Sequence, residues 1–103
     1  MSCSFRVLLE IRIRPGRAPA FEETWLEIAQ GIARHAANTG QCLLRSLEEP
    51  DTYVVISDWR DEPAFREFET SEAHQRNLAL LRPYRTGGSM KTMRVVHTLS
   101  GPR

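Results

Sequence analysis

The first segment of the chain alternates between apolar and other residues, and this pattern constrains the fold more than any other feature. From Phe5 to Arg14, every second residue is apolar. A period of two residues is typical of a β-strand that buries one face. Pro15-Gly16 follows and predicts a turn that ends the strand. The face that we expect to be buried comprises Phe5, Val7, Leu9, Ile11 and Ile13.

A helix and then two strands are predicted to follow. Pro19 suits the first turn of a helix. Apolar residues then recur at helical spacing to about Asn38, and Gly40 is expected to form the left-handed cap. Strands are predicted at 42–47 and 53–59, joined as a hairpin. The second of these strands presents on one face Tyr53, Val55, Ser57 and Trp59.

Two helical segments and a last strand complete the predicted order. Asp61 and Ser71 each precede a helical pattern and have the side chains of N-caps, and Pro83 stops the second helix. Residues 84–89 are rich in glycine and are expected to form a flexible connection. Residues 90–99 alternate again, which predicts the final strand.

This order of elements predicts an α+β fold of the ferredoxin-like βαββαβ type, a four-stranded antiparallel sheet with the helices on one face. One face of the sheet then stays uncovered. An exposed and partly apolar sheet is covered most simply by a second copy of the chain, so we expect a homodimer with the two sheets face to face. The residues expected on this face are Leu8, Leu43 or Leu44, Ile56 and Val96.

Composition narrows the class of protein. The 103 residues suit a single domain, 1–103, with a core at about 5–98. No apolar run is long enough for a membrane span and no signal peptide is evident, so we expect a cytoplasmic protein without a membrane partner. The net charge of +1 argues against a nucleic-acid partner. The three histidines and two cysteines are too dispersed to predict a metal site.

Three short motifs resemble those of one known family. A strand ends in Trp59, the stretch Asp61-Glu62-Pro63-Ala64-Phe65 follows, and Ser71-Glu72-Ala73-His74 comes next. Together they resemble the antibiotic biosynthesis monooxygenase family, and the resemblance spans about residues 5–98. It implies a dimeric α+β barrel with a pocket between helices and sheet in each subunit. Several members of that family oxidise polycyclic phenols to quinones with molecular oxygen and without flavin, haem or metal.

The resemblance also separates branches of the family. The haem-degrading branch has an asparagine, a tryptophan and a haem-ligating histidine where this chain has Leu9, Phe68 and Leu78, so haem degradation is not expected. The phenol-oxidising branch has the tryptophan that matches Trp59. It also has an asparagine and a tyrosine where this chain has Val55 and Phe65, so two hydrogen-bonding groups of that branch are missing.

The resemblance implies a function and a set of site residues. We expect a cofactor-independent monooxygenase that oxidises a phenol or anthrone-type polyketide intermediate to a quinone, with oxygen as co-substrate. His74 would be the base, because imidazole titrates near neutral pH, and Trp59 would donate its indole N–H to a bound oxygen atom. The substrate-binding set is Tyr53, Arg45, Phe65, Val55, His97 and Tyr84.

Other interpretations of these residues stay open. His74 also fits a histidine on a helix surface, Trp59 and Tyr53 fit core residues, and Arg45 fits an exposed ion pair. His97 fits either the pocket or the core. For the whole chain, the alternatives are a polyketide cyclase on the same fold and a non-catalytic protein that binds a hydrophobic aromatic intermediate.

Overall fold

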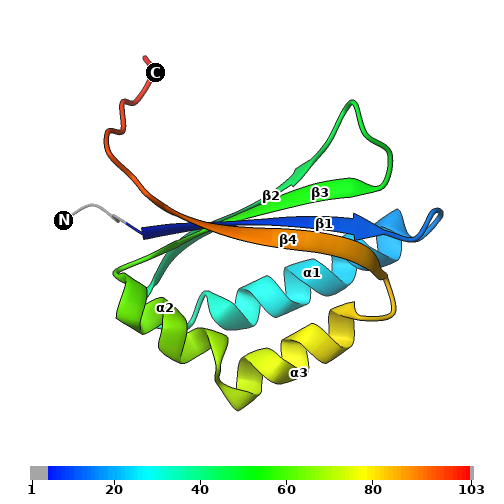
Figure 1. Cartoon of the computed structure of the whole chain (residues 1–103), viewed down its shortest axis with the longest axis horizontal. Helices are drawn as coiled ribbons and strands as arrows, with labels where there is room; N and C mark the ends of the chain where they lie inside the picture. Colours follow the sequence, from blue (N-terminus) through cyan, green and yellow to red (C-terminus); the bar gives the residue numbers. More distant parts are fainter. Residues whose placement is uncertain (1–4, 103) are drawn as a thin grey trace.

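The computed structural model describes residues 5–102 and contains one antiparallel sheet with three helices on one face (Figure 1). The strand order in the sheet is β2-β3-β1-β4, so the first strand lies in the interior of the sheet. This confirms the predicted α+β ferredoxin-like fold. In chain order the elements are β1 (Phe5–Ile13), α1 (Ala18–Ile32), β2 (Asn38–Arg45), β3 (Thr52–Trp59), α2 (Glu62–Glu69), α3 (Glu72–Leu81) and β4 (Arg85–Arg94).

The core lies between the sheet and the helices, as the alternation of β1 predicts. β1 pairs with β3 in a register that places Ile11 opposite Tyr53 and Phe5 opposite Trp59. All four side chains therefore point to the helix layer, where Phe21 of α1 is fully buried. Burial of these large apolar side chains is the main force that holds the helices on this face.

The two predicted helix caps are confirmed. The Asp61 carboxylate accepts a hydrogen bond from the Ala64 N–H at 2.9 Å and begins α2. The Ser71 hydroxyl accepts one from the His74 N–H at 3.2 Å and begins α3. The second cap restarts the helix after a break at Thr70, so that α3 runs under the sheet in a new direction (Figure 1).

The first helix and the second strand differ from their predicted bounds. α1 ends at Ile32, and a turn follows in which the His35 Nδ1 accepts a hydrogen bond from the Ala37 N–H at 3.2 Å. Bonds of the tighter i→i+3 type close the helix before this turn, from the Arg34 N–H to the Gly31 oxygen at 3.2 Å and from the His35 N–H to the Ile32 oxygen at 2.9 Å. β2 therefore begins at Asn38, and Gly40 lies within the strand rather than at a helix cap. The register between β2 and β3 shifts between Asn38 and Gly40, so Thr39 forms a β-bulge.

The last strand also begins earlier than predicted. β4 spans Arg85–Arg94, so most of the expected flexible connection is paired with β1. A Cβ atom on Gly88 would lie 2.4 Å from the Glu10 carbonyl oxygen, so only glycine allows this close pairing. Residues 95–102 form no strand, and Val96 is 77% exposed. The prediction that Val96 lies on the uncovered sheet face is therefore wrong.

The uncovered face carries a strip of apolar side chains across three strands. Leu8 of β1 lies opposite Ile56 of β3, and Val54 of β3 lies opposite Leu44 of β2. Leu43 pairs with the inward-facing Val55 of β3, so it points toward the helices instead and packs on the core. Of the two alternatives for this face, Leu44 is therefore the correct one.

Candidate active site

A mainly apolar cavity of about 100 Å³ lies between the sheet and the helices. Side chains of every helix and of every strand contribute to its wall. Most of them are the inward apolar residues of β1, β3, α1 and α3, which the alternation and the helical spacing place there. The polar side chains that reach the wall are Gln41, Ser57, Glu69, His74 and Asn77.

His74 combines burial with an unused nitrogen atom. Its ring packs on Phe68 with a centroid distance of 4.5 Å, and its Nδ1 is buried without a hydrogen-bond partner among the residues that the structure describes. Burial lowers the pKa of the His74 imidazole below its ordinary value of 6.5, and the nearby Glu69 carboxylate opposes this shift. The imidazole is therefore neutral at pH 7, and the His74 side chain lines the cavity.

Trp59 forms the end of the cavity where β3 meets α2. The side chain is 1% exposed, and its ring packs on Phe68 at 4.8 Å and on Phe65 at 5.5 Å between centroids. The indole Nε1 donates a hydrogen bond to the Ser57 hydroxyl at 3.0 Å. Because the Ser57 oxygen accepts this bond, the hydroxyl proton of Ser57 can be donated to another acceptor. Trp59 and His74 thus line the same cavity.

Two further predicted residues line the cavity as apolar wall. Val55 lies on the inward face of β3, and Phe65 lies on α2 beside Trp59. Both are buried. Neither offers a hydrogen bond through its side chain, so any polar contact to a ligand must come from other residues.

Tyr53 and Arg45 lie away from the cavity, contrary to the expectation for a substrate-binding pair. The Tyr53 hydroxyl donates to the Glu22 carboxylate at 2.5 Å, and Arg45 lies 3.6 Å from the same carboxylate. Burial, together with the bond to Glu22, raises the pKa of Tyr53 to about 12. This cluster fastens α1 to the far ends of β2 and β3, so the phenol is engaged in a structural contact.

Tyr84 and His97 also lie outside the cavity wall. The Tyr84 hydroxyl lies 3.3 Å from the Thr24 hydroxyl, and the Arg17 guanidinium lies over its ring at 5.1 Å. Tyr84 therefore packs against α1 instead of belonging to a flexible connection. His97 is exposed beyond the end of β4.

Four polar residues of the cavity were not among the site residues predicted from the sequence: Gln41, Ser57, Glu69 and Asn77. Ser57 shares its strand face with Trp59, so the period of two already placed it there. Asn77 follows His74 by three residues on α3, and helical spacing places the two on one side. Gln41 carried no such signal, because its pairing opposite Ser57 of β3 decides which way it points.

A metal site and a membrane-spanning helix each have requirements with which the described residues can be compared. Within residues 5–102, no three His, Cys, Asp or Glu side chains gather in a way that could hold a metal ion. None of the helices in this part of the chain has the length and apolar character needed to cross a membrane.

Several known proteins are similar to this chain. Protein SchA from Streptomyces halstedii is 28% identical over 82 residues, which is 80% of this chain and only 22% of that protein. The chain thus spans less than a quarter of the length of this curated relative.

Solved structures match the fold over nearly the whole chain. The cofactor-independent oxygenase SnoaB from Streptomyces nogalater is 22% identical, with a TM-score of 0.83 over 97% of this chain and 100% of that one. A putative antibiotic biosynthesis monooxygenase from Bordetella bronchiseptica is 21% identical, with a TM-score of 0.84 over 93% and 100%. The model of the antibiotic biosynthesis monooxygenase family matches residues 4–79, which is more than half of the chain, and the chain therefore belongs to that family.

Proposed function

We propose that the protein is a cofactor-independent monooxygenase that oxidises a phenol or anthrone-type polyketide intermediate to a quinone, with molecular oxygen as co-substrate. One observation carries the proposal: His74, whose Nδ1 is buried without a hydrogen-bond partner among the described residues, lines the same apolar cavity as Trp59. Membership of the family and the similar fold of SnoaB, a cofactor-independent oxygenase, support the same activity.

Proton removal by His74 is the first step of the proposed reaction. The neutral imidazole takes a proton from the phenol hydroxyl or from the methylene carbon of an anthrone, which leaves a delocalised anion. A base with a pKa near the working pH suits this task. The surrounding apolar side chains keep bulk water from the anion and so strengthen each polar contact that it makes.

Oxygen then receives electrons from the substrate anion, so no other reductant is needed. For an anthrone, a carbon–oxygen bond forms at the former methylene carbon and the O–O bond breaks. The carbon loses two hydrogens and gains a carbonyl oxygen, and the second oxygen atom leaves as water. One molecule of oxygen is consumed for each molecule of quinone.

The polar residues of the cavity would form hydrogen bonds to the anion. They would replace the asparagine and tyrosine that the phenol-oxidising branch has where this chain has Val55 and Phe65. The Ser57 hydroxyl has a proton to donate beside Trp59, and the Asn77 amide lies on the His74 side of the wall. Preorganised donors of this kind stabilise a developing negative charge because they need no reorientation during the reaction.

Oxygen uptake by the purified full chain tests this function. An anthrone in aerated buffer should be consumed faster with the protein than by its own autoxidation, with a quinone as the product in mass spectrometry. A dehydrated product formed without oxygen uptake would instead identify a cyclase and overturn the proposal. Saturable binding with no turnover would overturn it as well.

The apolar side chains of Val55 and Phe65 favour a second candidate, a non-catalytic protein that binds a hydrophobic aromatic intermediate. Both lie on the cavity wall and offer affinity without a hydrogen bond. Such a protein would bind the anthrone and its quinone with similar affinity, because neither His74 nor a donor would be needed. Calorimetric titration of both compounds separates this candidate from the oxygenase.

We further propose that the protein acts in the cytoplasm as a homodimer whose sheets pack face to face. The support is the apolar strip of Leu8, Leu44, Val54 and Ile56 on the sheet face opposite the helices, which no helix of the described chain covers. Burial of such a strip is favourable in proportion to its apolar area.

A further inference from the structure

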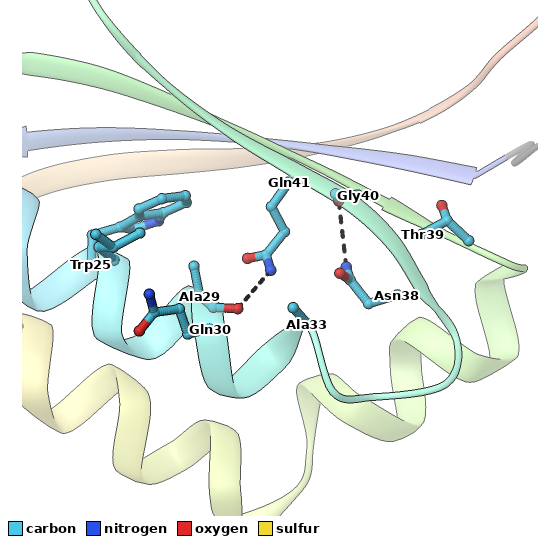
Figure 2. Close-up of a pocket in the computed structure, with 9 residues that line it drawn as sticks. Trp25, Ala29, Gln30, Ala33, Asn38, Thr39, Gly40 and Gln41 are labelled. Carbon is cyan, nitrogen blue, oxygen red and sulfur yellow. Dashed lines mark hydrogen bonds between the residues drawn. The ribbon is translucent and has the colours of Figure 1, made fainter.

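A second hollow shares a wall with the cavity. It is an open groove of about 380 Å³ between α1 and the edge strand β2. Trp25 and Gln41 line both the groove and the cavity. Figure 2 shows the Gln41 side chain reaching down from β2 to the Ala29 carbonyl on α1, with the Trp25 indole beside it. These two side chains therefore separate the inner cavity from the outer groove.

The size of the cavity makes this wall important. The cavity measures about 100 Å³, whereas an apolar cavity of about 150 Å³ is known to hold a single benzene ring. A fused-ring substrate of the proposed class therefore cannot lie wholly inside the cavity as it stands. Part of the substrate has to extend through one side of the wall.

The wall of Trp25 and Gln41 can open at low cost. Both residues are only half-buried, and Gln41 is held by one neutral hydrogen bond, from its Nε2 to the Ala29 oxygen at 2.9 Å. The Ala29 oxygen also accepts the Ala33 N–H at 2.9 Å, so it keeps a partner when Gln41 swings out. Another groove on the helix side shares with the cavity the core residues Ile28 and Phe68 and the half-buried residues Ile32 and Asn77.

The chemistry of the groove indicates what it would bind. Among the described residues, the side chains that line it carry no formal charge, and its polar groups include the amides of Gln30 and Asn38 and the hydroxyl of Thr39. The remainder of the lining includes small or apolar residues such as Ala33 and Leu26. Such a surface suits neutral hydroxyl or carbonyl substituents better than a carboxylate or phosphate, which would need a cation.

We propose that the groove is the outer half of the substrate site and that Gln41, with Trp25, sets how many fused rings the site accepts. This inference rests on the proposed function. The reacting ring lies in the inner cavity by His74, and the remote ring with its neutral polar substituents lies in the groove. Gln41 must leave the Ala29 carbonyl before a long substrate can bind, and a single-ring phenol does not require this movement.

Binding of a single-ring phenol and of a hydroxylated three-ring anthrone tests the inference by calorimetry without oxygen. The variant Gln41→Met keeps the length of the side chain and removes the hydrogen bond. We expect it to bind the three-ring compound about two- to tenfold more tightly, since the closed arrangement loses the hydrogen bond that favours it. The phenol should bind as before. Gln75→Met is the matched control, because Gln75 is exposed on α3 outside both hollows.

A second variant fills the groove instead of opening the wall. Ala33 is exposed at the end of α1 and lines the groove but not the cavity, so Ala33→Trp should fold normally. It should weaken binding of the three-ring compound and leave the phenol unchanged. Equal effects on both compounds, or no effect of either variant, would overturn the inference.

The same titrations distinguish this inference from the proposed function. If Gln41→Met and Ala33→Trp change the binding of the three-ring compound alone and the protein takes up no oxygen, the proposed oxygenase function is wrong and the two-part site is still supported. If the protein takes up oxygen and the variants change the binding of both compounds equally, the oxygenase function is supported and the two-part site is wrong. Failure of every aromatic compound to bind the parent protein would overturn both.

Discussion

At the scale of single residues, His74 owes its properties to its neighbours. The main-chain N–H of His74 donates a hydrogen bond to the Ser71 hydroxyl, and the imidazole ring packs against Phe68. The first contact sets where the side chain leaves α3, and the second removes water from the imidazole. Removal of water disfavours the charged form of the ring, which is why the pKa falls.

Replacement of His74 tests its role as the base. His74→Ala should lower kcat/KM for the anthrone by about 10²–10⁴-fold, the usual effect of losing a general base. Steady-state oxygen uptake measures this change, and Gln75→Ala is the control on the next residue of the same helix. A decrease of only a few-fold in the histidine variant would show that another group takes the proton.

The pH dependence of the reaction follows from the lowered pKa of His74. The base acts in its neutral form, so kcat/KM should rise as pH increases through the pKa of His74 and then stay level. Because burial holds this pKa below 6.5, the rising limb should lie below pH 6.5 and the plateau should include pH 7. A profile of kcat/KM against pH checks this, and a limb centred above 6.5 would contradict the assignment.

At the scale of elements, the pairing of β1 with β4 depends on the absence of a side chain at Gly88. The main chains approach so closely there that a Cβ atom would overlap the Glu10 carbonyl oxygen. β4 is an edge strand, and its Met90 side chain forms part of the cavity wall. The position of this wall therefore depends on a glycine more than 10 residues away from any proposed catalytic group in the sequence.

Alanine at two glycine positions should have opposite effects on stability. Gly88→Ala should reduce the free energy of unfolding by about 1–3 kcal/mol, because the added methyl group forces the strands apart. Gly31→Ala, in the last turn of α1 where no atom lies within 4 Å of the added Cβ, should increase it by about 0.5–1 kcal/mol. Urea unfolding measures both changes. Equal free energies of unfolding for the two variants would show that the strands at Glu10 and Gly88 can move apart without a loss of stability.

At the scale of the whole molecule, one face of the sheet is covered by helices and the other is open (Figure 1). The open face mixes apolar and charged side chains, with Arg6 paired to Asp58 at 2.6 Å near one end of the strip. A second copy that packs on the strip would bury Leu8 and Ile56 at its centre, where β1 and β3 pair. Charged residues at the edges would remain in water.

The size of the particle in solution tests this arrangement. Light scattering after gel filtration should give the mass of two chains at micromolar concentration. Ile56→Arg should shift the particle toward one chain, because it places a charge inside the buried strip, whereas Ile56→Val should not. A parent protein that elutes with the mass of a single chain would rule the dimer out.

Local patterns in the sequence were sufficient for most of the fold, and the two proposed central site residues came from the family resemblance. The alternation of β1 and β3 predicts which face of each strand is buried, and the cap residues Asp61 and Ser71 predict where helices begin. Both features are predictable because they depend on residues that are neighbours along the chain. Trp59 and His74 were expected in the site because their motifs resemble those of the antibiotic biosynthesis monooxygenase family. The structure places both on the cavity wall.

Position along a strand was not predictable in the same way. Tyr53 and Trp59 share a face of β3, but six residues of strand separate them by about 20 Å. A period of two identifies the face and carries no information about which end of the strand borders the cavity. For that reason Tyr53 and Arg45 were expected in the site and instead fasten α1 to the sheet at its far end.

The sequence by itself determined the kind, order and buried faces of the elements, since these depend on side chains a few residues apart. Only the tertiary structure decided how the edge strands join the sheet. The pattern of Gly87 and Gly88 predicts a loop, and only the pairing with β1 makes these residues part of a strand. Gln41 points to the helices because it pairs opposite Ser57 of β3, and no pattern among its neighbours in the chain fixes that direction.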